Sequence, residues 1–267
     1  TDFKTADELS AYEKDLVRTI GGEGYVLLEN SDTPGKGLPL KTEASNKTKV
    51  SLFSHSSVDI IAGGTGSGTG VASVTLKDAF EAQNFEVNKT LWDFYSTGGG
   101  KSYKRGAGVI NYGMGEDWKI NECPLTVLES GGVLNSAAGT TPIFILSRTG
   151  GEGMDLARYM GKFTFVDADK TKHYLEPDSV ELNIIDYLNR NFRNVILVVN
   201  TNNVPELGWV KNYANIGAVL WAPGGGGETA NSIVDVISGK ATASGHLVDT
   251  IAYDAFSSPA MKNMGDF

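Results

Sequence analysis

The chain has 267 residues, of which 33 are glycine, and its formal net charge at pH 7 is −9. This charge repels phosphate backbones and anionic membranes on average, so it argues against a nucleic-acid-binding or membrane-surface protein. No apolar run reaches the length of about 18 residues that a membrane-spanning helix needs. The single cysteine, Cys123, rules out an internal disulfide, which favours the cytoplasm without excluding secretion.

The first part of the chain indicates short helices and strands separated by turns. Residues 6–20 are predicted to form an amphipathic helix, because Leu9, Leu16, Val17 and Ile20 recur at helical spacing. The segments predicted to follow are a short apolar stretch at 25–28, a strand at 50–53, a helix at 75–83, a short strand at 85–87 and a helix at 90–95. Residues 98–139 contain many turn formers and no clear strand, and only segment 123–128 indicates a helix.

Beyond residue 141 the pattern becomes regular. The runs 143–146, 195–199 and 217–221 predict buried strands, since they are apolar at nearly every position. Helices are predicted at 178–192, with Asp178 or Ser179 as N-cap, and at 228–237. The alternation predicts an α/β fold: a single-domain, three-layer α/β/α sandwich around a mostly parallel sheet over residues 1–267, with 98–139 as an irregular insert.

In such a sheet, four segments are expected at the edge where the parallel strands end. They are residues 63–70, 150–155, 200–205 and 223–229. Ligand chemistry in open α/β sheets is found at this edge. Their convergence is expected geometry, however, and is not by itself evidence of function.

The glycine-rich segment 63–70 does not match a nucleotide-binding motif. Its glycines alternate as G-x-G-x-G, and no Lys-Ser or Lys-Thr follows, so it is neither a dinucleotide fingerprint nor a P-loop. Two interpretations stay open: a flexible surface loop, or a backbone wall that offers the hydroxyls of Thr65, Ser67 and Thr69 to a polar neutral ligand. Sugars suit such a wall, because hydroxyls both donate and accept hydrogen bonds.

Glu152 is the strongest candidate for a catalytic residue. It follows the predicted strand 143–146 and lies among Gly150, Gly151 and Gly153, which allow close approach to a ligand. A carboxylic acid enclosed by a substrate and a partner surface can keep its proton near neutral pH and act as a general acid. A solvated loop acid is the equally open alternative.

Two other glutamates have glycine neighbours but are weaker candidates. Glu23 precedes its apolar stretch instead of following one, so it is expected at the opposite edge of the sheet. Glu228 follows Gly224–Gly227 and opens a predicted helix, where the helix dipole favours the anion over a proton donor.

Other kinds of site find little support. The histidines, His55, His173 and His246, are scattered, and with one cysteine there is no metal-ligand spacing, so we expect no metal and no cofactor. The sequence around Ser67 lacks the register of a nucleophile elbow. Trp209 and Trp221 are expected to pack in the core or at strand ends, with stacking on a sugar as the alternative.

Several motifs together resemble the α/β-sandwich domain of glycoside hydrolase family 3. The resemblance extends over nearly the whole chain, in order, and its combination of motifs is specific. The motifs are the stretch 24–30 with Leu38-Pro39-Leu40, the glycine loop 63–68, the segment Ser147 to Asp155, and the closing section 223–239 with Ser244-Gly245-His246-Leu247.

The resemblance implies a domain of a retaining, exo-acting β-glycosidase of the β-glucosidase type. By analogy, Glu152 is the general acid/base, Ser67 reaches the sugar in the first subsite, and Arg148 helps to shape that pocket. The chain departs from the family at Met154, where an aromatic residue is common, and at Leu156, where arginine is common.

In this family the nucleophilic aspartate lies in a separate (β/α)₈ barrel, and this chain shows no barrel-length repeat. The segment 248–254 looks like that of members in which the sandwich precedes the barrel. The expected partners are therefore a β-glycoside or oligosaccharide substrate and a barrel domain of the same enzyme or of a partner chain. The alternative from another class is a non-catalytic carbohydrate-binding α/β module.

Overall fold

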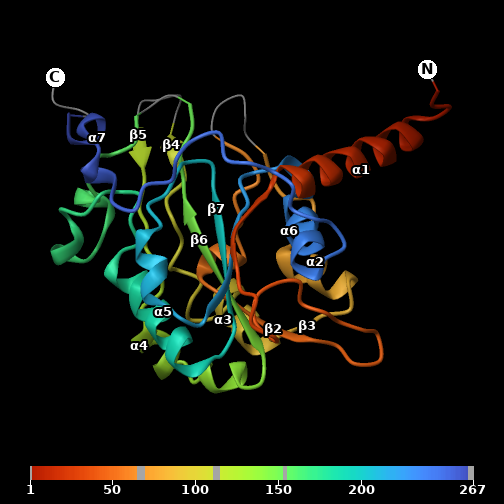
Figure 1. Cartoon of the computed structure of the whole chain (residues 1–267), viewed down its shortest axis with the longest axis horizontal. Coiled ribbons are helices and arrows are strands. Elements are labelled where there is room, and N and C mark those ends of the chain that lie inside the picture. Colours follow the sequence, from red (N-terminus) through yellow and green to blue (C-terminus); the bar gives the residue numbers. More distant parts are fainter. Residues whose placement is uncertain (1, 65–69, 111–114, 153–154, 264–267) are drawn as a thin grey trace.

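A computed structural model describes residues 2–64, 70–110, 115–152 and 155–263, and its centre is a six-stranded sheet (Figure 1). The strand order is β1-β8-β7-β6-β2-β3. The strands are β1 (Val26–Asn30), β2 (Lys49–Phe53), β3 (Glu86–Val87), β6 (Thr141–Arg148), β7 (Val195–Thr201) and β8 (Ile216–Trp221). Every neighbouring pair is parallel except β1 and β8, which are antiparallel. The prediction of a mostly parallel sheet is confirmed.

Helices cover both faces of this sheet. The helices of the described residues are α1 (Ala6–Gly24), α2 (Leu76–Ala82), α3 (Lys89–Ser96), α4 (Leu125–Ser130), α5 (Ser179–Asn191), α6 (Thr229–Ser238) and α7 (Pro259–Asn263). α2 and α6 share one apolar core with one face of the strands, and α3, α4 and α5 share a second core with the other face. The central strands are apolar at successive positions because both of their faces are buried. The three-layer sandwich is thus confirmed.

The helix predicted at 178–192 begins where its capping chemistry indicates. Asp178 is the N-cap: its carboxylate accepts from the backbone N–H groups of Val180 and Glu181, while Glu181 Oε2 accepts from the Asp178 N–H at 2.9 Å. This reciprocal capping box satisfies donors that the first helical turn leaves open. Of the two residues that the sequence offered, the cap is therefore Asp178 rather than Ser179.

The stretch 98–139 contains a hairpin that its sequence does not reveal. β4 (Gly108–Ile110) pairs antiparallel with β5 (Gly115–Asp117), and each strand has only three residues, too few to establish a pattern. Residues 155–178 lie between β6 and α5, and we call them the excursion. The excursion and the stretch 98–139 together enclose a small core. Its members are Trp118, Ile120, Met160, Phe163 and Tyr174.

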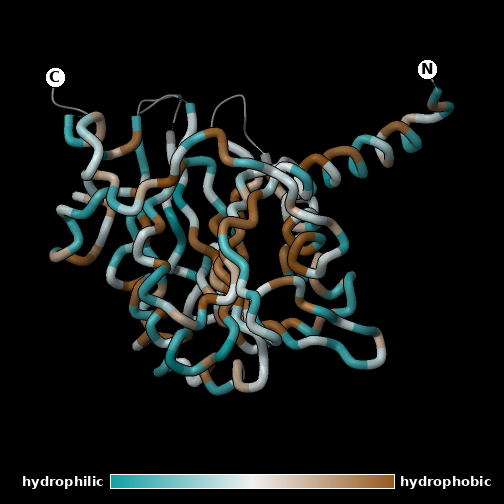
Figure 2. The backbone as a smooth tube through the Cα atoms, in the orientation of Figure 1, coloured by the Kyte–Doolittle hydropathy of each residue, from teal (hydrophilic) through white to brown (hydrophobic). Residues whose placement is uncertain are grey.

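α1 extends away from the sandwich (Figures 1 and 2). Its apolar side chains are largely exposed. Of its 19 residues only Gly21 and Gly22 are buried, and Gly21 lies against Ser232 of α6. The predicted helix is confirmed and continues to Gly24. No described helix is long and apolar enough to cross a membrane.

Candidate functional site

The described parts of the four predicted segments meet at the carboxyl edge, the edge of the sheet at which the parallel strands end. Gly226 N–H donates to the Ala62 carbonyl at 2.7 Å, and Gly224 N–H donates to Asn202 Oδ1 at 2.8 Å. Asn203 Nδ2 lies 3.4 Å from the Thr149 carbonyl. The predicted convergence of these segments is confirmed for the residues that the structure describes.

Asn200 is the central connector of this edge. Its side chain is fully buried at the end of β7. Its Oδ1 accepts from the Ile61 N–H at 2.6 Å, and its Nδ2 donates to the carbonyls of Ile61 and Ala222 at 3.0 and 2.9 Å. One amide thus satisfies backbone groups of the loops that follow β2 and β8. The signal in the sequence is a buried apolar strand that ends in Asn-Thr-Asn-Asn.

Glu152 lies in an exposed position on the loop that leaves β6. The base of this Glu152 loop, residues 149–152, is held from two sides. Thr149 Oγ1 donates to the Gly106 carbonyl at 3.0 Å, and a Cβ on Gly150 would lie 2.5 Å from the Asn203 amide. The loop therefore has a base held by these contacts and an exposed glutamate, an arrangement compatible with both interpretations of Glu152.

Arg148 is buried beneath the edge. Its guanidinium donates to both carboxylate oxygens of Glu181, each at 2.7 Å, and to the carbonyls of Ser147, Tyr174 and Glu176. It is not among the residues that line the neighbouring cavity. Arg148 therefore joins the end of β6 to the excursion and to α5. Its part in shaping the pocket stays a prediction, in which Arg148 acts through these segments and not by direct contact.

Ser67 lies outside the described residues, as do Thr65, Thr69 and Met154. The expected approach of Ser67 to a sugar beside Glu152 therefore stays a prediction. The described ends of its loop, Gly64 and Gly70, both line the cavity described below.

The position predicted for Glu23 is wrong. Val26, at the start of β1, pairs with Trp221, at the end of β8, because β1 runs antiparallel to its neighbour. Glu23 therefore lies at the carboxyl edge and not opposite it, although it faces a separate hollow beside Arg18 and Asp235. Glu228 is confirmed at the start of its helix, where its Oε2 accepts from Asn231 Nδ2 at 2.6 Å.

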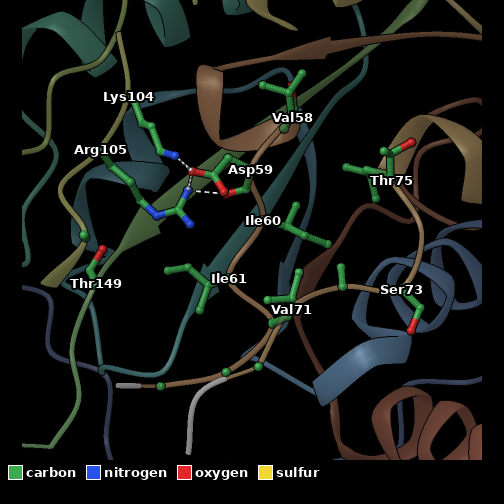
Figure 3. Close-up of a pocket in the computed structure, with 18 of the residues that line it drawn as sticks. Val58, Asp59, Ile60, Ile61, Val71, Ser73, Thr75, Lys104, Arg105 and Thr149 are labelled. Atoms are coloured by element: carbon green, nitrogen blue, oxygen red, sulfur yellow. Dashed lines mark hydrogen bonds and ion pairs between the residues drawn. The ribbon is translucent and has the colours of Figure 1, made fainter. Parts of the chain in front are cut away.

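A cavity of about 550 Å³ opens between the loop after β2 and the base of the Glu152 loop (Figure 3). Its wall combines apolar side chains with hydroxyls and charges. The lining includes Ile60, Ile61 and Val71, the hydroxyl-bearing residues Ser73, Thr75 and Thr149, and the charged residues Asp59, Lys104 and Arg105. This composition suits a ligand with both apolar and hydroxyl-bearing surfaces.

Asp59, Lys104 and Arg105 form an ion-pair group that we call the Asp59 cluster. Asp59 Oδ2 lies 3.6 Å from Lys104 Nζ and 3.6 Å from Arg105 Nη1, and Arg105 Nη1 also donates to the Asp59 carbonyl. Burial lowers the pKa of Arg105, while the Asp59 carboxylate opposes that shift. The sequence did not single out these residues, because Lys104 and Arg105 lie in its irregular stretch.

No group of histidine, cysteine, aspartate and glutamate side chains that could hold a metal ion is found within residues 2–64, 70–110, 115–152 and 155–263. Trp209 and Trp221 pack against the second core, as expected. Trp209 Nε1 donates to the Glu206 carbonyl and Trp221 Nε1 to the Thr201 carbonyl, at 2.9 and 3.1 Å.

Comparisons with known proteins agree on one family. The model of the glycosyl hydrolase family 3 C-terminal domain matches residues 25–265. The chain is 29% identical over 252 residues to a beta-glucosidase of Ruminococcus albus, covering 91% of this chain and 23% of that protein. It is 28% identical over 250 residues to beta-glucosidase A of Butyrivibrio fibrisolvens, covering 86% of this chain and 27% of that protein. The chain thus spans about a quarter of the length of these relatives.

Solved structures show the same fold. A beta-glucosidase from Paenibacillus barengoltzii matches with a TM-score of 0.72 and 27% identity, over 94% of this chain and 25% of that one. Beta-glucosidase 3B from Thermotoga neapolitana, solved in complex with glucose, matches with a TM-score of 0.73 and 21% identity. That match covers 97% of this chain and 33% of the other, and at this identity it supports the fold alone.

Proposed function

Because this chain belongs to the family of glycosyl hydrolase family 3 C-terminal domains, we propose that it is one domain of a retaining, exo-acting β-glycosidase of the β-glucosidase type. In this proposal Glu152 is the general acid/base, and the carboxyl edge forms part of the sugar-binding cleft. The observation that carries it is an exposed, glycine-flanked glutamate on the loop that follows β6, and the base of this loop lines a cavity that has hydroxyl-bearing residues in its wall. The names of the relatives, beta-glucosidases, support the same reaction.

The proposed chemistry needs a second carboxyl group. In a retaining mechanism two carboxyl groups lie about 5–5.5 Å apart on either side of the bond that breaks. Glu152 donates its proton to the leaving oxygen, while the other carboxylate attacks the sugar and forms a covalent intermediate. Glu152 then takes a proton from the water that releases the sugar. We propose that the attacking carboxylate comes from a (β/α)₈ barrel in the same enzyme or in a partner chain.

The residues of this chain have distinct parts in that mechanism. Thr149 and Asn203 hold the base of the Glu152 loop, so that the carboxylate is presented at a fixed place. Ser67 binds the sugar in the first subsite, and Arg148 positions the end of β6. A partner surface that covers the exposed Glu152 would exclude water from the reacting bond.

The proposal is tested with the purified 267-residue chain. The chain alone is expected to leave nitrophenyl β-glucoside unhydrolysed, because it lacks the attacking carboxylate. Robust hydrolysis by this chain would refute the division of the cleft between two parts. Sugar binding together with full tolerance of a Glu152 substitution in the complete enzyme would favour a non-catalytic carbohydrate-binding module.

A further inference from the structure

Arg105 is a nearly buried cation in the wall of the cavity. Its side chain is 13% exposed, against 63% for Lys104. Among the described residues, the hydrogen bond to the Asp59 carbonyl and the ion pair with Asp59 Oδ2 both involve Nη1. No hydrogen bond from Nε or Nη2 is found within that part of the chain. The guanidinium therefore borders the cavity with N–H donors that are available to a ligand (Figure 3).

Leaving such donors unused costs free energy. A charged group withdrawn from water loses hydration that only compensating hydrogen bonds restore. Asp59 compensates in part, since its carboxylate lies 3.6 Å from the guanidinium. The lowered pKa of Arg105 indicates that this compensation is incomplete. A ligand that brings acceptor oxygens into the cavity would supply the hydrogen bonds that are still missing.

The neighbourhood of Arg105 selects the chemistry of that ligand. Asp59 offers acceptors beside the donors of Arg105, so the best fit is a group that both donates and accepts, which is the property of a hydroxyl. An anion such as phosphate would meet the Asp59 carboxylate. The apolar side chains of Ile60, Ile61 and Val71 in the same wall suit the C–H face of a sugar ring.

We propose that Arg105 and Asp59 form a clamp that binds two adjacent hydroxyls of a neutral sugar in this cavity. The identification of the ligand as a sugar rests on the proposed function. Arg105 donates to one hydroxyl through Nε or Nη2, and Asp59 accepts from its neighbour. Such paired contacts fix the orientation of the ring as well as its position.

The clamp is preorganised by contacts already present. Asn200 fixes Ile61, two residues after Asp59. Gly106, next to Arg105, donates its N–H to the Lys119 carbonyl at 2.7 Å and accepts from Thr149 Oγ1 at 3.0 Å. Thr149 belongs to the Glu152 loop, so a sugar held by the clamp lies beside the base of the loop that carries the proposed acid. Preorganisation of this kind reduces the entropy that binding costs.

The test is a titration of the purified chain with glucose, followed through backbone amide chemical shifts. Shifts are expected at residues 59–64, 104–107 and 149–150. Arg105→Met and Asp59→Asn should each weaken binding at least about tenfold, because each removes a hydrogen bond to a charged group. Arg190→Met is the matched control, since this arginine is exposed on α5, and it should leave the affinity unchanged.

Monodeoxy glucoses separate a direct contact from a structural effect. Wild-type chain should bind two derivatives that lack adjacent hydroxyls more weakly than glucose, and Arg105→Met should abolish the difference for one of them. This comparison uses the wild-type chain first, so it remains decisive even where a variant folds poorly. No shifts at the named residues, unchanged affinity in both variants, or displacement of glucose by inorganic phosphate would overturn the clamp.

The outcome is independent of the proposed acid. The acid role is tested by the activity of the complete enzyme, whereas the clamp is tested by glucose binding to this chain alone. A failed clamp would leave the acid role of Glu152 standing, and a failed acid role would leave the clamp as a sugar-binding site.

Discussion

Arg148 and Glu181 form a bidentate ion pair in the interior of the protein. Nη1 lies 2.7 Å from Oε1 and Nη2 lies 2.7 Å from Oε2, with the two side chains 2% and 4% exposed. Glu181 belongs to the first turn of α5, whereas Arg148 is the last residue of β6. The pair therefore joins the helix to the strand end from which the Glu152 loop departs.

Breaking this pair should be costly. Arg148→Met is expected to lower the free energy of unfolding by about 3–5 kcal/mol, because it leaves the Glu181 carboxylate buried without its partner. Urea denaturation measures the change. The exposed Arg190→Met should stay within about 0.5 kcal/mol of wild type. The double variant Arg148→Met/Glu181→Leu should recover much of the loss, and a single variant as stable as the control would contradict this role of the pair.

Asn200→Ala should destabilise the carboxyl edge. The substitution leaves the Ile61 N–H and two carbonyls buried without partners, so a loss of more than about 2 kcal/mol is expected. Asn202→Ala is the matched control, since Asn202 is exposed and accepts a single hydrogen bond from Gly224. Urea denaturation and hydrogen exchange of the Ile61 amide are the measurements. Equal effects of the two substitutions would show that Asn200 does not organise this edge.

Glu122 should make stability depend on pH. Burial raises the pKa of this carboxyl to about 8, while the Cys123 N–H, 2.8 Å from Oε1, favours the charged form and limits the rise. The native chain thus keeps a proton that the unfolded chain releases near its ordinary pKa of about 4.3. This stabilisation is complete below pH ~4.3 and is lost as the pH rises to about 8.

The measurement is the free energy of unfolding at several pH values between these limits. Glu122→Gln should lose less stability than wild type as the pH rises, since its side chain does not titrate. Burial also raises the pKa of Asp178, to about 6, and this shift likewise lowers stability as the pH rises. Part of the loss of stability at the lower pH values will therefore persist in the Glu122→Gln variant. Identical slopes for the two proteins would rule out Glu122 as a source of the decline.

The sequence predicted the sandwich because strands buried on both faces are apolar throughout. For example, the observed β6 and β7 contain the predicted ranges 143–146 and 195–199 and differ from them only by additional residues at their ends. Strand direction leaves no such pattern. The short apolar stretch that became β1 fits either orientation, and Glu23 was therefore assigned to the wrong edge.

The candidate site was only partly predictable for a related reason. Glu152 is visible in the sequence because glycines and a strand end flank it. Asp59 and Arg105 lie far apart in the chain and match no motif, so only the packing of the irregular stretch against the loop after β2 brings them together. Arg148, predicted to shape the pocket, has its donors directed at Glu181 and at backbone carbonyls.

The acid role of Glu152 is tested most directly by kcat/KM of Glu152→Gln in the complete enzyme that we propose, on β-glucosides with good and poor leaving groups. A general acid contributes about 10²–10⁴-fold to rate, and a leaving group that departs unaided does not need it. Glu23→Gln is the matched control, since Glu23 is also flanked by glycines and exposed at the same edge. We expect a large loss of kcat/KM for poor leaving groups, a small one for dinitrophenyl glucoside, and none in the control. Equal losses on both substrates would contradict the acid role.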